Sequence, residues 1–291
     1  MSPLPDPAMA DMPARSATAH NTGLNTPRQR AAWLLLALAA LTVLLTALGA
    51  SVGSTGFDSV LRLADDPMAA RIVWDIRLPR SLGAWLAGAL LGLSGAVAQG
   101  LFRNPLAEPF LLGSASGASL GVAAALALFG AAPATAWLAK LGLTGAAFVG
   151  AVVAVLLTLQ LARGVQHTLR LLLAGVIVGV VLGAIKDLIT LASPDIIAAM
   201  QGFNLGSAGF IGWASCVLML LAWCVCMAGA WVFSRALDGL SLGESTAASL
   251  GLPLVPMRVA LVAVLALSTG TAVAQTGLIA FVGLAAPHLV R

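Results

Sequence analysis

The feature that most constrains this chain is the recurrence of apolar blocks about as long as a bilayer is thick. A window of roughly 19 residues finds seven such blocks, which lie at 31–50, 81–101, 113–132, 143–162, 171–192, 209–233 and 258–276. An eighth apolar stretch, 278–290, is shorter. Backbone groups in lipid must be paired within their own segment, and strand-like alternation is absent. We therefore expect membrane-spanning helices and no porin-like barrel.

Composition supports an all-α polytopic membrane protein. Hydrophobic residues make up 60% of the 291 and charged residues 9%, whereas a soluble domain carries about a quarter charged residues. The first 30 residues differ, being rich in Pro, Ala, Ser and Thr. They lack a basic segment followed directly by an apolar one, so they do not resemble a signal peptide. We predict a disordered cytoplasmic tail over 1–30 and a membrane domain over 31–291.

The arginines set the expected topology. With a cytoplasmic tail, the inside segments hold Arg15, Arg28, Arg30, Arg103, Arg163, Arg170, Arg235 and Arg258. The outside segments hold Arg62, Arg71, Arg77, Arg80 and Lys140. The positive-inside rule favours this orientation. The outside cluster within 56–80 is its main exception and needs a separate explanation.

A polar break, "RNPLAEPFLLG", separates the second and third blocks. Pro105 forbids helix continuation and pushes the preceding residue towards extended geometry. Asn104 and Glu108 can bond the backbone groups that this frees. Non-helical backbone at such depth is tolerated only inside protein or along a cavity. We therefore predict a structural joint beside a pathway, formed by Arg103, Asn104, Pro105, Glu108, Pro109 and Gly113.

Two charged neighbours, Lys186 and Asp187, lie inside the fifth block. Adjacent helix residues point about 100° apart, so we expect them to bridge each other poorly. Lys186 lies about 22 Å along the helix at 1.5 Å per residue, in the outer third of the bilayer. One interpretation is a Lys that snorkels outward while Asp187 pairs with a neighbour. The other is a polar wall of a water-filled pathway.

The segment between the sixth and seventh blocks contains signals for a short helix. Ser241 and Glu244 form the S-x-x-E pattern of a capping box. Gly251 is placed to end the helix, and Pro253 follows it. A helix of about nine residues is too short to span a membrane. Its interior is Ser, Thr and Ala, which suits a docking element as well as an ordinary interfacial helix.

The sequence lacks the residue patterns of common catalytic and metal sites. No G-x-x-x-x-G-K-[ST] loop and no H-E-x-x-H is present. The three cysteines, Cys216, Cys224 and Cys226, fall within one block and have no zinc-ligand spacing. We therefore expect no catalytic residues, no metal, no cofactor and no nucleic-acid partner.

Four stretches together resemble the FecCD-type permeases, the membrane subunits of ABC importers for iron–siderophores, haem and vitamin B12. The longest is "IRLPRSLGAWLAGALLGLSGAVAQGLFRNPLAEPFLLGSASGAS", 76–119. The others are "LLLAGVIVG" (171–179), "LSLGESTAASLGL" (240–252) and "GLIAFVGLAAPHLVR" (277–291). The resemblance runs from about residue 30 to the end, in the family's order.

The resemblance implies a fold and a set of partners. The family has ten transmembrane helices with both termini cytoplasmic, in the bacterial inner membrane. It implies a permease homodimer embedded in the lipid bilayer, with the path between the two copies. Cytoplasmic ABC ATPase subunits would hydrolyse ATP, so this chain would be a transport subunit and not an enzyme. A periplasmic substrate-binding protein would deliver the substrate.

The resemblance also assigns residues. The coupling segment that fits the ATPase cleft would comprise Ser241, Leu242, Gly243, Glu244, Ala247, Leu250 and Gly251. Arg77 and Arg80, in "IRLPR", match basic positions that receive carboxylates of the binding protein. That role would explain the outside arginine cluster. Lys186 and Asp187 lie outside the shared motifs, so they are candidate pathway residues specific to this protein.

One departure affects the expected function. Family members continue through two more helices after the "PHLVR" match, whereas this sequence ends at Arg291. About eight of the ten helices are therefore expected, with the C-terminal ones missing. Two alternatives stay open: a degenerate or truncated fragment that does not transport, and an ion-driven secondary transporter suggested by Lys186 and Asp187.

Overall fold

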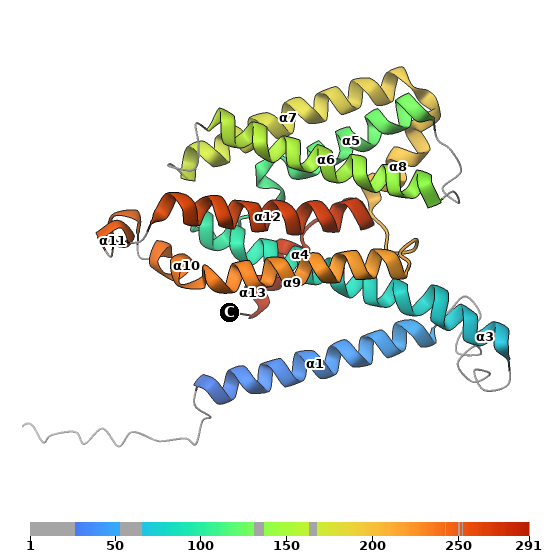
Figure 1. Cartoon of the computed structure of the whole chain (residues 1–291), viewed down its shortest axis with the longest axis horizontal. Helices are drawn as coiled ribbons and strands as arrows, with labels where there is room; N and C mark the ends of the chain where they lie inside the picture. Colours follow the sequence, from blue (N-terminus) through green and yellow to red (C-terminus); the bar gives the residue numbers. More distant parts are fainter. Residues whose placement is uncertain are drawn as a thin grey trace, which may run out of the picture. The chain divides into compact units, whose positions relative to one another are not determined.

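The computed structural model describes residues 27–52, 66–130, 137–162, 168–241, 243–249, 251 and 253–290, and these parts are helical apart from their connections (Figure 1). The all-α prediction is therefore confirmed. The chain divides into two units, Met1–Val43 and Leu44–Arg291. Helix α1, Pro27–Ser51, crosses that boundary and begins inside the predicted tail. The remainder of that tail, 1–26, lies outside the described residues.

The second unit contains both short and long helices. They are α3 Pro67–Arg71, η2 Ile72–Arg77, α4 Leu78–Phe102, η3 Pro109–Leu112, α5 Ser114–Phe129, α6 Trp137–Leu161, α7 Thr168–Ala192, η4 Pro194–Ile196, α8 Ile197–Leu205, α9 Trp213–Val232, α10 Ser234–Ser241, α11 Glu244–Ser249, α12 Leu254–Thr276 and α13 Val282–Val290. Figure 1 shows α10 and α11 at one end of the long helices α9 and α12, and α8 at the other. With the predicted topology, these are the inner and outer ends.

Six helices among the described residues are long and apolar enough to cross a membrane, one fewer than the seven blocks predicted. They lie at Ala32–Ser51, Pro67–Phe102, Gly142–Leu161, Leu169–Ala192, Trp213–Val232 and Leu254–Thr276. The predicted span at 113–132 is α5, which has only 16 residues. It is shorter than predicted because the helix ends at Phe129, where Gly130 takes a φ of 77°. The eighth stretch yields the nine residues of α13.

Helices α4 and α12 form the interior of the second unit. In the most apolar 18-residue window of each helix, 67% of the residues of α12 and 50% of those of α4 are buried inside the protein. Leu261 and Leu265 of α12 are fully buried with Leu101 of α4 and Leu112 of η3. Burial of these side chains fixes the inner half of the unit around the polar break.

Small residues let α5 and α6 touch through their backbones. A Cβ added at Gly117 would lie 2.3 Å from the carbonyl oxygen of Gly150, and one at Gly121 would lie 2.1 Å from that of Ala146. Neither position has room for a side chain. Close approach of this kind is how membrane helices gain dispersion energy where lipid removes the hydrophobic driving force.

Candidate functional site

The inner end of α4 closes with a left-handed turn. Arg103 has a φ of 49°, and its N–H bonds the carbonyls of Gln99 and Gly100. The N–H of Asn104 also reaches the Gln99 carbonyl, at 3.1 Å. The Oδ1 of Asn104 then accepts from the N–H of Leu106 at 2.9 Å. Asn104 thus bonds backbone freed by Pro105, as its position predicted.

Glu108 makes a different contact from the one expected. Its Oε1 accepts from the N–H of Phe281, 3.3 Å away, in the link between α12 and α13. Phe281 has a φ of 66°, which is uncommon for a residue other than glycine. The carboxylate therefore joins two segments far apart in sequence, and the local interpretation of Glu108 was wrong.

The outer end of the joint is held by α6 and α7. The hydroxyl of Thr158 in α6 donates to the carbonyl of Leu112 at 2.9 Å, fully buried. In α7, a Cβ added at Gly175 would lie 2.0 Å from the carbonyl oxygen of Leu111. Gly113 turns the chain into α5 beside this contact. The second half of the segment, 107–113, therefore folds back between helices with its non-helical backbone largely enclosed by protein, whereas 103–106 are exposed.

Lys186 and Asp187 do form an ion pair, contrary to the prediction. The Nζ of Lys186 lies 2.6 Å from Oδ1 of Asp187. The long Lys stem spans the angle that separates the two Cβ positions. The side chain of Lys186 is 18% exposed and that of Asp187 is 72% exposed. The carboxylate therefore faces away from its own chain, towards solvent, lipid or a partner.

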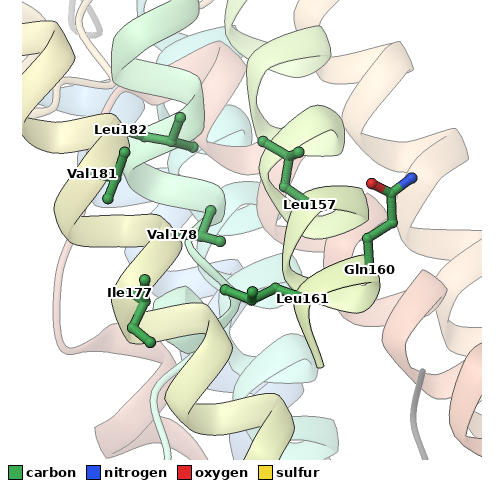
Figure 2. A pocket seen from close by; sticks show the side chains of 7 residues that line it. All are labelled: Leu157, Gln160, Leu161, Ile177, Val178, Val181 and Leu182. Carbon is green, nitrogen blue, oxygen red and sulfur yellow. The ribbon is translucent and has the colours of Figure 1, made fainter. Parts of the chain in front are cut away.

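An open groove of about 470 Å³ lies between α6 and α7. Figure 2 shows Leu157 and Leu161 of α6 pointing towards the lining residues of α7, which are Ile177, Val178, Val181 and Leu182. Gln160 lies on the other flank of α6. The groove thus offers apolar surface and few hydrogen-bonding groups, which suits an apolar helix or lipid better than a polar substrate.

The two arginines at the outer end of α4 differ in exposure. Arg77 is 9% exposed, and its Nη1 donates to the carbonyl of Ser51 at 3.1 Å. Arg77 ends the π-helix η2, a type of helix that often marks functional sites. Arg80 is exposed. Of the predicted docking pair, Arg80 alone presents its side chain fully on the surface.

The predicted coupling helix is divided in two. Ser241 belongs to α10, and Gly243, with a φ of 111°, separates it from the six residues of α11. The side chains of Ser241 and Glu244 lie outside the described parts, as do Leu242 and Leu250. Gly251 is left-handed, with a φ of 74°, as expected beyond a helix end. Ala247 is buried, whereas Thr246 and Ser249 are exposed.

Comparison with known proteins fixes the family. The model of the FecCD transport family matches residues 36–291. The chain belongs to the FecCD transport family. A vitamin B12 import system permease protein BtuC of Shigella boydii is 39% identical over 91% of this chain and 78% of its own length. One from Escherichia coli O1:K1 is 41% identical over 77% of this chain and 68% of its own length.

A solved structure supports the same fold. It is described as an inward-facing conformation of a metal-chelate type ABC transporter. The TM-score is 0.77 and the identity 27%, over 88% of this chain and 80% of that one. This FecCD chain is therefore a multi-pass inner-membrane protein, the permease subunit of an ABC importer. Within that family the permease is a transport subunit and not an enzyme.

Sequence reasoning missed two polar residues beside the joint. Gln99 of α4 is buried and its Nε2 donates to the carbonyl of Leu284, 3.1 Å away in α13. Thr158 holds Leu112 from α6. A lone amide in an otherwise apolar block was a visible signal for Gln99, because such groups are costly in a membrane unless paired. Thr158 carried no comparable signal.

Proposed function

We propose that two copies of this permease, with cytoplasmic ATPase subunits and a binding protein, import vitamin B12 or a close corrinoid. The observation that carries the substrate is the identity of 39% over 91% of the chain to a vitamin B12 import permease. A metal–chelate such as a ferric siderophore is the second candidate. It is favoured by the structural match to a metal-chelate type transporter at 27% identity. Haem is a third member of the substrate class that the resemblance implies.

The ATPase would bind the α10–α11 segment. Two short helices there project from the inner ends of α9 and α12 (Figure 1). Exposed small side chains at Thr246 and Ser249 allow another protein surface to approach closely. This geometry supports a coupling role for 241–251.

The binding protein would dock at the outer end of α4, where Arg80 is the exposed cation. Nearby, Trp213 donates its Nε1–H to the carbonyl of Trp74 at 3.1 Å, and the two rings lie 5.4 Å apart. Such aromatic residues gather at membrane interfaces. They support placing this end at a membrane surface, which the predicted topology makes the outer one, where a carboxylate of the binding protein would meet Arg80. Arg77 would act by fixing the backbone that carries Arg80.

The second copy would cover α7. That helix exposes Leu173, Ile177, Val180 and Val181 along one side, beside the groove of Figure 2. A path between two copies would then run beside α7. The exposed carboxylate of Asp187 would face it, with Lys186 as its counter-ion. The polar joint, 103–113, would lie beside the inner half of the same path.

Reconstitution tests this function. The permease, a cognate ATPase and binding protein are placed in proteoliposomes, and ATP-driven uptake of labelled cyanocobalamin is compared with that of a ferric siderophore and haem. Cyanocobalamin uptake supports the first candidate, and uptake of a chelate alone replaces it with the second. Absence of ATP-dependent uptake of all three would favour the non-transporting alternative. Uptake without ATPase that collapses with the proton gradient would favour a secondary transporter.

A further inference from the structure

The first turn of α13 is bonded by side chains from two other segments. Nε2 of Gln99, near the inner end of α4, donates to the carbonyl of Leu284 at 3.1 Å. Oε1 of Glu108, just before η3, accepts from the N–H of Phe281 at 3.3 Å. Both bonds link residues more than 170 positions apart in the chain. The turn is thus tied on one side to α4 and on the other to the polar joint.

Glycines allow the backbone of this turn to contact its neighbours directly. A Cβ added at Gly95 would lie 1.7 Å from the carbonyl oxygen of Gly283, and one at Gly283 would lie 2.3 Å from Cγ of Pro109. Gly95 precedes the end of α4 by about 10 Å at 1.5 Å per residue. The contact therefore lies within the membrane-spanning part of α4. The first turn of α13 therefore lies directly against α4 and the joint, where side chains of both can bond it.

Stability alone does not account for Gln99. Its side chain is 2% exposed, and its Oε1 receives no hydrogen bond from any described residue. A carbonyl can only accept, so the amide nitrogen must face Leu284 and the oxygen is left without a donor. An unpaired buried amide oxygen destabilises the folded protein. A methionine would fill the same space without that cost, so the bond to α13 is what the glutamine adds.

These contacts lie between the two ends of the unit. On the inner side, Leu237 of α10 packs on Gly100, the neighbour of Gln99. On the outer side, the link after α12 is bonded to the end of α8. There the N–H of Leu278 donates to the carbonyl of Phe203 at 3.0 Å. A continuous series of contacts therefore runs from the ATPase-facing segment to the outer helix α8.

We propose that Gln99 and Glu108 form a clasp on the first turn of α13 that carries motion of α10–α11 to α8 during transport. The proposal rests on the ATP-driven import argued above. It makes both residues positioning residues, because they act through α13 and α8 without touching substrate. Loss of either bond should let the inner and outer ends move separately, so that ATP is hydrolysed with less transport.

The test uses the full complex in proteoliposomes and measures labelled cyanocobalamin moved per ATP hydrolysed. The variants are Gln99→Met and Glu108→Gln. The matched controls are Gln275→Met, in the same "AVAQ" context on α12, and Asp195→Asn, an exposed carboxylate in η4. A coupling energy of 1–3 kcal/mol corresponds to roughly 5–150-fold, so we expect a fall of about tenfold for Gln99→Met and less for Glu108→Gln. An unchanged ratio for Gln99→Met, or an equal fall for Gln275→Met, overturns the proposal.

Thermal unfolding separates coupling from mere structure. Gln99→Met removes an unpaired buried oxygen, so we expect the midpoint to be unchanged or raised. A purely structural bond predicts a lowered midpoint and a parallel loss of uptake and ATPase activity. That parallel loss would overturn the clasp, whereas lost uptake in a protein at least as stable as the parent supports it.

If the parent complex does not import cyanocobalamin, the proposed substrate is wrong but the clasp is still untested. A second measurement therefore tests the clasp without transport. Hydrogen exchange of 200–206 and 277–284 is compared between nucleotide-free and vanadate-trapped complexes. We expect both segments to respond in the parent, and both responses to weaken in Gln99→Met once the link to α4 is lost. An identical response of 200–206 in both proteins contradicts the proposal.

Discussion

The polar joint and the α10–α11 segment both interrupt the long helices on the inner side, but they are held in opposite ways. In the joint, Pro109 and Leu111 touch the backbones of Gly283 and Gly175 with no space for a Cβ. In the coupling segment, a Cβ at Gly243 would find its nearest neighbour 3.9 Å away. The first region is fixed by the helices around it, whereas the second is open to a partner. Added bulk should therefore unfold the joint but only block association at α11.

The largest expected effect is at the α4–α13 contact. Gly95→Val places side-chain atoms where the Gly283 carbonyl lies, and the neighbour is backbone that cannot swing away. Overpacking of this kind costs about 3 kcal/mol or more, so we expect little folded protein. Gly88 is the matched control on the same helix, because a Cβ there meets nothing within 4 Å. Normal detergent-solubilised yield and melting of Gly95→Val would contradict the close contact.

A bulky residue on α11 tests whether the α10–α11 segment is open to a partner. Gly243 and Ala247 are unsuitable positions, because the first has a φ of 111° and the second is buried. Thr246 is exposed, so Thr246→Trp should change the free energy of unfolding by no more than about 0.5 kcal/mol. We expect ATPase binding to weaken at least about tenfold, since a hot-spot contact is worth about 2 kcal/mol. Pull-down of the ATPase measures this.

Tryptophan at Asp195 serves as the control for Thr246→Trp. Asp195 is also exposed, but it lies in η4, beyond the outer end of α7. ATPase binding should therefore be unaffected by Asp195→Trp. Equal loss in both variants would mean that the bulky residue acts through general destabilisation, and normal binding by Thr246→Trp would remove α11 from the docking surface.

Substitutions at Arg77 and Arg80, at the outer end of α4, should have effects of intermediate size. Arg80→Glu reverses an exposed charge, so we expect binding-protein affinity to fall about tenfold at low salt and less at high salt. Arg77→Gln removes a buried guanidinium bonded to Ser51, so we expect lower thermal stability with a weaker salt dependence. Binding titrations at two ionic strengths measure the difference. A similar salt dependence for both variants would mean that Arg77 also meets the binding protein directly.

The sequence predicted what periodic hydropathy and local turn chemistry can encode. The long apolar blocks gave the membrane-length helices, and Pro105 with Asn104 gave the end of α4. The sequence did not predict contacts between distant segments. Glu108 was assigned to its own turn because nothing near it in sequence indicates Phe281 as its donor. The short α5 was also missed, because hydropathy does not indicate that Gly130, with a φ of 77°, ends the helix after Phe129.

The smallest expected effect concerns a single buried hydroxyl of the joint. Thr158→Val keeps the shape of the side chain but removes the bond to the Leu112 carbonyl, which should cost about 1 kcal/mol of unfolding free energy. Thr190→Val is the control, because the Thr190 hydroxyl donates to the carbonyl of Lys186, one turn back on its own helix. Mixed-micelle unfolding measures both. A cost at Thr158 no larger than that at Thr190 would mean that the joint is held by its backbone contacts alone. The joint would then differ from the α10–α11 segment only in the close glycine contacts around it.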